Sequence, residues 1–265
     1  MPFPQLTFLG NSGILLRMPD CDTCIDPYLT DAVAEVHGDR FRRRIPPPVG
    51  PAALAGLNAI FLTHAHEDHT DLCTLLPMLS ASREAVVVAP RESRELLASA
   101  GVPRTRLAQP GPGWLGIGGG LQFRALPAAH LDVETHANGE WRHVGYLFRW
   151  PGGMLYHAGD TIPHPAIITE LEREGQPDWA LLPVNERSYF RSQRGIIGNM
   201  SPREAFEFAD VIGARHVIPM HWDIFPDNGT SIDEILAAHR QAPRRFTLKL
   251  LTAGESTPLV SSPIE

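Results

Sequence analysis

The sequence has few cysteines and no long apolar run. Three cysteines among 265 residues are too few for the disulfide frameworks of small secreted domains. Cys21 and Cys24 form a CxxC pair, but no second CxxC or HxxxH completes a structural zinc site, so buried thiols are the expectation. No stretch reaches the length of a membrane span, and residues 1–5 lack the basic and apolar segments of a signal peptide. These absences favour a cytoplasmic protein without a membrane partner.

The chain also has no excess of positive charge. It carries 23 Lys and Arg against 30 Asp and Glu, a formal net charge of -7. This balance argues against a broad nucleic-acid interface, because phosphate backbones require a basic face. A small anionic partner bound by a few local arginines stays compatible, and the sequence allows a homo-oligomer. The 12 histidines are the unusual feature, and their clustering points to metal or proton chemistry.

Apolar patterns predict a single domain over residues 1–265, with strands and helices in both halves. We expect strands within 6–18 (two, turning at 10–13), 23–29, 59–63, 85–89, 121–126, 144–150, 154–158, 179–184, 217–220 and 246–251. We expect helices over 71–80, 91–100, 167–174 and 231–241, and one beginning after Ser201 as a capping box with Glu204. Residues 31–51, 108–120 and 185–200 are expected to be loops. The order of strands followed by helices recurs in each half, which predicts an α/β (α+β) fold of two packed sheets with helices outside.

A histidine-rich run directly follows the apolar strand predicted at residues 59–63. His64 and His66 stand at alternate positions and can project to one side of an extended loop, and Asp68 and His69 follow where the next helix begins. Bringing this many polar groups to the end of a core strand is costly unless a cation holds them together. The run therefore predicts a metal site.

One loop cannot enclose two metals, so further ligands are expected at the ends of later strands. Three residues fit: His130, Asp160 and His221. Each follows an apolar strand and precedes a turn or a helix. A lone histidine at a strand end is more often a satisfied polar residue, but the upstream cluster favours a ligand role here.

The HxHxDH run, the later lone His, the Asp in a Gly-Asp-Thr turn and the last strand-end His resemble the metallo-β-lactamase superfamily over nearly the whole chain. The resemblance implies a four-layer αββα sandwich with two metal positions. It places one metal on His64, His66 and His130. It places the second on Asp68, His69 and His221, with Asp160 bridging the two.

Two further residues are candidates for supporting these ligands. Asp26 resembles the superfamily's early-strand Asp and is expected either to orient a ligand imidazole or to serve only its turn. His157 precedes the Gly-Asp-Thr turn and is a candidate for a supporting role, against purely local hydrogen bonding. His143 and the remaining histidines are expected to be structural or solvent-exposed.

Two cations a few ångströms apart would supply a metal-bound hydroxide near neutral pH and polarise a carbonyl or phosphoryl oxygen. The predicted reaction is hydrolysis of an ester, lactone, amide or phosphodiester. Asp68 is the predicted catalytic residue, because it could bind metal and carry the proton to the leaving group. Nitrogen and oxygen ligands without thiolate suit Zn or Mn, and Fe also fits.

The predicted substrate site lies in the polar loop at residues 185–200, on the side where the ligands gather. Arg187, Tyr189, Arg191 and Asn199 are its candidate phosphate-binding residues. The alternative is a solvated charged loop. For the arginines within residues 40–44 the solvated loop is the expectation.

Within the superfamily, residues 8–14, 146–157 and 217–224 resemble the branch that contains the L-ascorbate-6-phosphate lactonase. The leading hypothesis is therefore a lactonase-like hydrolase of a small phosphorylated substrate. A phosphodiesterase or nuclease of the same fold is the first alternative. A di-iron redox protein is the second, although such proteins usually need a flavin-binding domain that this chain lacks.

Overall fold

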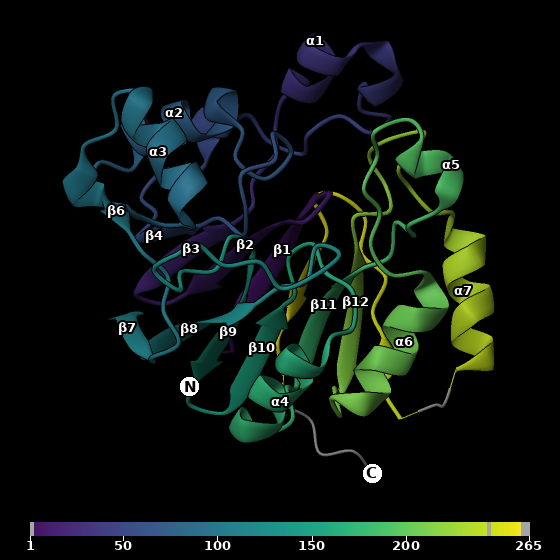
Figure 1. Cartoon of the computed structure of the whole chain (residues 1–265). Coiled ribbons are helices and arrows are strands. Elements are labelled where there is room, and N and C mark those ends of the chain that lie inside the picture. Colours follow the sequence, from purple (N-terminus) through teal and green to yellow (C-terminus); the bar gives the residue numbers. More distant parts are fainter. Residues whose placement is uncertain (1–2, 243–244, 261–265) are drawn as a thin grey trace.

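The computed structural model describes residues 3–242 and 245–260. These residues form two sheets packed face to face, with helices on the outer faces (Figure 1). The predicted four-layer αββα sandwich is thereby confirmed. Within the described ranges, none of the helices has the length and hydrophobicity needed to cross a bilayer.

The first sheet has seven strands. Their spatial order is β14 (Ser256–Pro258), β1 (Gln5–Gly10), β2 (Gly13–Met18), β3 (Cys21–Ile25), β4 (Ala59–Phe61), β5 (Val86–Val88) and β6 (Leu107–Ala108). Strands β3 to β6 run parallel, so their carboxyl ends meet at one edge of the sheet. Cys21 and Cys24 lie three residues apart on β3 and pack into different hydrophobic cores, on opposite faces of the sheet.

The second sheet also has seven strands. Their order is β13 (Thr247–Leu248), β12 (His216–Met220), β11 (Trp179–Pro183), β10 (Gly153–His157), β9 (Val144–Trp150), β8 (Leu121–Pro127) and β7 (Leu115–Gly118). Strands β10 to β13 are parallel, and β9 is antiparallel to both β8 and β10. Strands β8, β10 and β12 therefore point the same way, and their carboxyl ends share an edge.

An aromatic cluster joins the two sheets directly beneath that edge. Phe61, the last residue of β4, packs edge-on against Phe123, Tyr146 and Phe148 of the facing sheet, with ring centroids 4.8, 5.1 and 4.9 Å away. The Tyr146 hydroxyl donates a hydrogen bond of 2.8 Å to the carbonyl of Leu62. This contact fixes the backbone immediately before the histidine-rich run to the second sheet.

The helices form the outer layers. Helices α2 (Leu72–Ala81) and α3 (Arg91–Ser99) cover the first sheet, and α4 (Pro165–Glu174), α6 (Pro202–Val211) and α7 (Ile232–Gln241) lie along the second (Figure 1). Two short helices, α1 (Ala32–His37) and α5 (Tyr189–Ser192), lie above the sheet edge where the ligand-bearing strands end. Three 3₁₀ turns complete the elements: η1 (Asp39–Phe41), η2 (Pro51–Ala53) and η3 (Arg104–Arg106).

Several predicted boundaries were wrong. The presumed loops contain α1 and η1 within 31–51, β7 within 108–120, and α5 within 185–200. Tertiary contacts explain α1, because Val33 is buried beside Tyr28 and Phe225 in a small separate core. The last predicted strand, over 246–251, is reduced to β13, which pairs with β12 through only two residues.

The predicted capping box at Ser201 is only half formed. The Ser201 hydroxyl accepts the backbone N–H of Glu204 at 3.2 Å, but the Glu204 carboxylate binds the Arg187 guanidinium instead. A complete capping box forms at Ser231 with Glu234, at the start of α7. The competing ion pair with a distant residue could not be seen in the local pattern.

Candidate metal centre

The candidate centre is assembled at the shared edge of the two sheets. His64 follows β4, His130 follows β8, Asp160 follows β10 and His221 follows β12. Because these strands end at the same side of the sandwich, residues separated by up to 157 positions converge. The structure brings all seven predicted ligands together.

Three imidazoles form the first ligand group. The nitrogens of His64, His66 and His130 lie within 4.8 Å of one another. His64 Nε2 is 2.9 Å from His66 Nδ1, and the His130 ring centroid is 5.2 and 5.0 Å from theirs. Two ligand nitrogens of a tetrahedral zinc ion stand about 3.3 Å apart, given bonds of about 2.05 Å. This group therefore has the spacing of a three-histidine metal position.

A second group lies beside the first. Asp68, His69 and His221 again place ligand atoms within 4.8 Å of one another, and His221 Nε2 is 3.3 Å from Asp68 Oδ2. Asp160 adjoins the second group: its Oδ1 is 3.4 Å from His69 Nε2, and its Oδ2 is 3.5 Å from His221 Nε2. A third combination joins His64, His69 and Asp160 within the same limit. This arrangement makes Asp160 the residue that links the two positions.

The charges of the cluster suit cation binding. Burial lowers the pKa of His130 to about 4 and that of His64 well below its usual value, with neighbouring imidazoles adding to the effect. Burial alone would also lower the pKa of His69, but the carboxylates of Asp160 and Asp68 raise it to about 10. The His221 and His69 imidazoles outweigh burial and lower the pKa of Asp160 to about 2. His64 and His130 thus keep free lone pairs at neutral pH, beside an ionised carboxylate.

Unpaired ligand atoms support the same conclusion. Among the described residues, His69 Nε2, both ring nitrogens of His130, and Asp160 Oδ1 are buried without a hydrogen-bond partner. Buried polar atoms are normally hydrogen-bonded, so several unpaired polar atoms that face one another require an explanation. Divalent cations would supply it, since imidazole nitrogens and carboxylate oxygens are ligands of Zn, Mn and Fe. The residues present fit two such ions.

Asp26 lies directly behind the second group. It is fully buried at the end of β3, where Oδ2 is 2.7 Å from His69 Nδ1 and also accepts the Thr63 hydroxyl at 2.5 Å. Its Oδ1 accepts the Thr63 backbone N–H at 2.8 Å. A carboxylate bonded to Nδ1 keeps a proton on that nitrogen, so Nε2 is the atom through which His69 would bind a metal, in exchange for its second proton.

His157 supports the backbone beside the ligands. Its Nε2 donates to the Ser12 carbonyl at 2.9 Å, and its Nδ1 accepts the Gly159 N–H at 3.3 Å. Both ring nitrogens are therefore used, and burial lowers the pKa of this imidazole. His157 connects the turn between β1 and β2 to the turn that presents Asp160.

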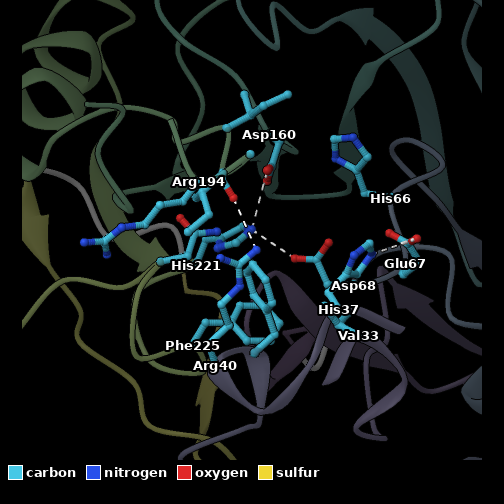
Figure 2. Close-up of a pocket in the computed structure, with 15 residues that line it drawn as sticks. Val33, His37, Arg40, His66, Glu67, Asp68, Asp160, Arg194, His221 and Phe225 are labelled. Atoms are coloured by element: carbon cyan, nitrogen blue, oxygen red, sulfur yellow. Dashed lines mark hydrogen bonds and ion pairs between the residues drawn. The ribbon is translucent and has the colours of Figure 1, made fainter. Parts of the chain in front are cut away.

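A cavity of about 350 Å³ opens above the ligands (Figure 2). Its floor is formed by His66, Asp68, Asp160 and His221. The remaining lining residues come from the α1–η1 segment and the histidine-rich loop, from the residues after α5, and from the loop after β12: Val33, His37, Arg40, Phe41, Glu67, Arg194, Gly195, Ile196, Ile197, Phe225 and Asn228. The volume suits a small molecule.

The residues predicted to bind substrate lie elsewhere. Arg187 binds Glu204 and the Asn199 carbonyl, and Arg191 donates to the carbonyls of Gly229, Asn185 and Glu186. Asn199 is fully buried, where its side chain donates to the Asn185 side chain, and Tyr189 is 70% exposed. None of these four predicted residues lines the cavity above the ligands. The same loop contributes Arg194 to Ile197 instead.

Three residues near the centre were not among the predicted site residues. The Asn11 side chain donates to Asp68 Oδ2 at 3.1 Å, and Arg40 lines the cavity. The His143 ring lies 5.2 Å from that of His130 and 5.4 Å from that of His64. His143 stands immediately before β9, and this position at a strand end was the sequence signal that could have identified it. Asn11 and Arg40 gave no comparable signal.

Comparison with known proteins agrees with this geometry. The sequence pattern of the β-lactamase superfamily domain matches residues 27–222, which include every ligand described above. The chain belongs to the metallo-β-lactamase superfamily. A UPF0173 metal-dependent hydrolase of Nitratidesulfovibrio vulgaris is 30% identical over 263 residues, covering 96% of this chain and 95% of that protein. The chain is thus a member of the superfamily's metal-dependent hydrolases.

Two further likenesses bear on this superfamily member. A probable L-ascorbate-6-phosphate lactonase of Escherichia fergusonii is 29% identical over 206 residues, covering 73% of this chain and 56% of that protein. Among solved structures, the metallo hydrolase Igni18 of Ignicoccus hospitalis matches with a TM-score of 0.72 at 19% identity, over 96% of this chain and 97% of that one. The similarity to Igni18 shows a shared fold.

Proposed function

We propose that this superfamily member hydrolyses a small anionic lactone or ester, with two divalent cations bound by the seven predicted ligands. One observation carries the proposal: the floor of a small-molecule cavity is made of four predicted metal ligands, and two arginines line the same cavity. Cations held there would lower the pKa of a bound water molecule and polarise the substrate oxygen. Zinc or manganese suits the nitrogen and oxygen ligands.

Asp68 is the residue to which we assign proton transfer. It forms part of the cavity floor, and its Oδ2 accepts a hydrogen bond from Asn11 and lies 3.3 Å from His221 Nε2. Despite its burial, the neighbouring His69 and His221 imidazoles hold the pKa of the Asp68 carboxyl below its usual range. The carboxylate is therefore ionised, and its free lone pairs are what a group needs in order to accept a proton from water and return it to the leaving oxygen.

Arg40 is the proposed anchor for the substrate anion. Its guanidinium donates to the Arg194 carbonyl at 3.3 Å and stacks 4.7 Å from the centre of the Phe41 ring. Its other N–H groups have no acceptor among the residues that the structure describes. The Arg194 side chain extends away from the ligands in Figure 2 and lies 3.6 Å from Asp227. Arg40 is therefore the better placed of the two for a phosphate, as the resemblance to phosphorylated-lactone hydrolases suggests.

The reaction is tested with the purified full chain. Metal is removed with a chelator and restored with Zn²⁺ or Mn²⁺, and hydrolysis of a phosphorylated lactone, a neutral lactone and a bis-aryl phosphodiester is followed. About two metals per chain and restored lactone hydrolysis are expected. If only phosphodiester cleavage returned, the phosphodiesterase alternative would replace this proposal. A chain that binds no metal would remove its basis.

The anion anchor is tested with paired substitutions. Arg40→Ala removes one charge-assisted interaction, so KM for the phosphorylated lactone should rise about 10- to 100-fold, at about 1.5–3 kcal/mol. KM for the neutral lactone should stay within a factor of about two. Arg187→Ala is the matched variant from the loop predicted by sequence. A larger effect of Arg187→Ala than of Arg40→Ala would return the anion site to that loop.

A further inference from the structure

The turn between β1 and β2 reaches the metal centre through one residue, Asn11. Asn11 is 1% exposed and has a left-handed backbone, with φ of 56°. Its backbone N–H donates to Asp223 Oδ1 at 3.0 Å, and its carbonyl accepts the N–H of His221 at 2.7 Å. Asparagine tolerates this conformation better than most residues with a side chain. The backbone of Asn11 is thus fixed on both sides.

The side chain of Asn11 acts on a different ligand. Its Nδ2 donates to Asp68 Oδ2 at 3.1 Å and lies 3.4 Å from the Asp68 carbonyl. That carboxylate oxygen is also the one closest to the other two ligands of the group, 3.3 Å from His221 Nε2 and 3.7 Å from His69 Nε2. The amide therefore orients the Asp68 oxygen that faces the second metal position.

His221 depends on the same turn for its direction. It has a left-handed backbone, with φ of 61°, which is costly for a residue of this size. Its backbone N–H is bonded to the Asn11 carbonyl, and this bond helps to hold the unusual conformation. Asn11 consequently contacts two of the three ligands of the second group, one through its side chain and one through its backbone.

We propose that Asn11 is a positioning residue for the second metal position, acting through Asp68 and His221. The inference rests on the proposed function, because it requires the two ligand groups to bind metal. Partners that orient ligands typically change metal affinity by 10- to 100-fold when they are removed. Loss of the Asn11 amide should weaken the second position and leave the three-histidine position unchanged.

The test is Asn11→Gly, measured by calorimetric titration of Zn²⁺ into the metal-free full chain. Glycine adopts the left-handed backbone readily and keeps both backbone hydrogen bonds, so only the side-chain donor is lost. Asn58→Gly is the matched control, since it removes an amide that accepts the Asp22 N–H at 2.9 Å, away from the ligands. Thermal unfolding of each metal-free variant checks that the fold is kept.

Two backgrounds separate the metal positions. In a His130→Ala background, Asn11→Gly should weaken Zn²⁺ binding about 10-fold or more. In a His221→Ala background it should change the affinity less than about twofold. Equal affinities with and without Asn11→Gly in the first background would overturn the positioning role, as would an equal loss caused by Asn58→Gly. A wild-type chain that binds no Zn²⁺ would instead reject the proposed function itself.

Discussion

Replacing Asp26 by Asn tests the control of a ligand's protonation by a buried carboxylate. The Asp26 oxygens accept three hydrogen bonds: one from the Thr63 backbone, one from its hydroxyl, and one from His69 Nδ1. Asparagine has nearly the same shape and tolerates the left-handed φ of 43° at this position, so the backbone should persist. Only the hydrogen-bonding pattern and the charge change.

The expected effect follows from counting donors and acceptors. If the new amide oxygen accepts the Thr63 N–H, the amide nitrogen faces His69 Nδ1, which must then be an acceptor. A neutral His69 would then carry its proton on Nε2, the atom that lies 3.4 Å from Asp160 Oδ1 beside the second metal position. A protonated Nε2 cannot bind a metal. Zn²⁺ affinity at that position should fall about 10- to 100-fold, or about 1.4–2.7 kcal/mol.

The assay is calorimetric Zn²⁺ titration combined with urea unfolding of the metal-free chain. The loss of a charged, buried acceptor should also lower the free energy of unfolding by about 1.5–3 kcal/mol. Asp178→Asn is the control, because this buried carboxylate bonds Met154 and Arg215 away from the centre. The control should lose stability and keep its metal affinity. Wild-type Zn²⁺ affinity in Asp26→Asn would refute the tautomer argument.

Three further predictions follow from the fold. Phe61→Ala should lower the free energy of unfolding by about 3–5 kcal/mol in urea titrations, since Phe61 fills the aromatic contact between the sheets; a loss below about 1 kcal/mol would contradict that packing. Zn²⁺ at 100 times its dissociation constant should stabilise the chain by about 2.7 kcal/mol per site in scanning calorimetry, and an unchanged transition would argue against metal binding. Cys21 and Cys24 should both remain free thiols after mild oxidation, as counted with a thiol reagent in the unfolded chain. Three strand residues span about 10 Å, beyond disulfide reach, so an intrachain bridge would contradict their placement on opposite faces.

The convergence of His64, His130, Asp160 and His221 could be predicted because each of the four follows an apolar strand. An apolar strand followed at once by His or Asp places that side chain at the end of a sheet, and parallel strands bring such ends together. Short helices lack a signal of this kind. Helix α1 has only six residues and depends on Val33 packing in a small core with Tyr28 and with Phe225, which is distant in sequence. Its contribution to the cavity wall therefore appears only with the tertiary structure.

The arginines show why substrate contacts are harder to predict than metal ligands. A guanidinium can bind substrate only if no internal partner occupies it, and sequence does not reveal that partner. Arg187 is engaged by Glu204, although local pattern assigned Glu204 to a capping box. Within residues 40–44 nothing local distinguishes Arg43, which binds the Tyr28 carbonyl, from Arg40, which lines the cavity. Contacts with other parts of the fold decide which of these arginines lines the cavity.

At the metal centre, the backbone conformation of several residues is also decided by contacts that the sequence does not reveal. Asn11, Asp26 and His221 are three of the five non-glycine residues with positive φ in the described part of the chain. Such conformations cost about 1 kcal/mol or more each and persist only where surrounding contacts impose them. Here those contacts run between the three segments: Asp26 bonds His69, and Asn11 bonds both Asp68 and His221. The unfavourable backbone geometry is thus offset by the same hydrogen bonds that aim the ligands, so stability of these turns and metal affinity should rise and fall together.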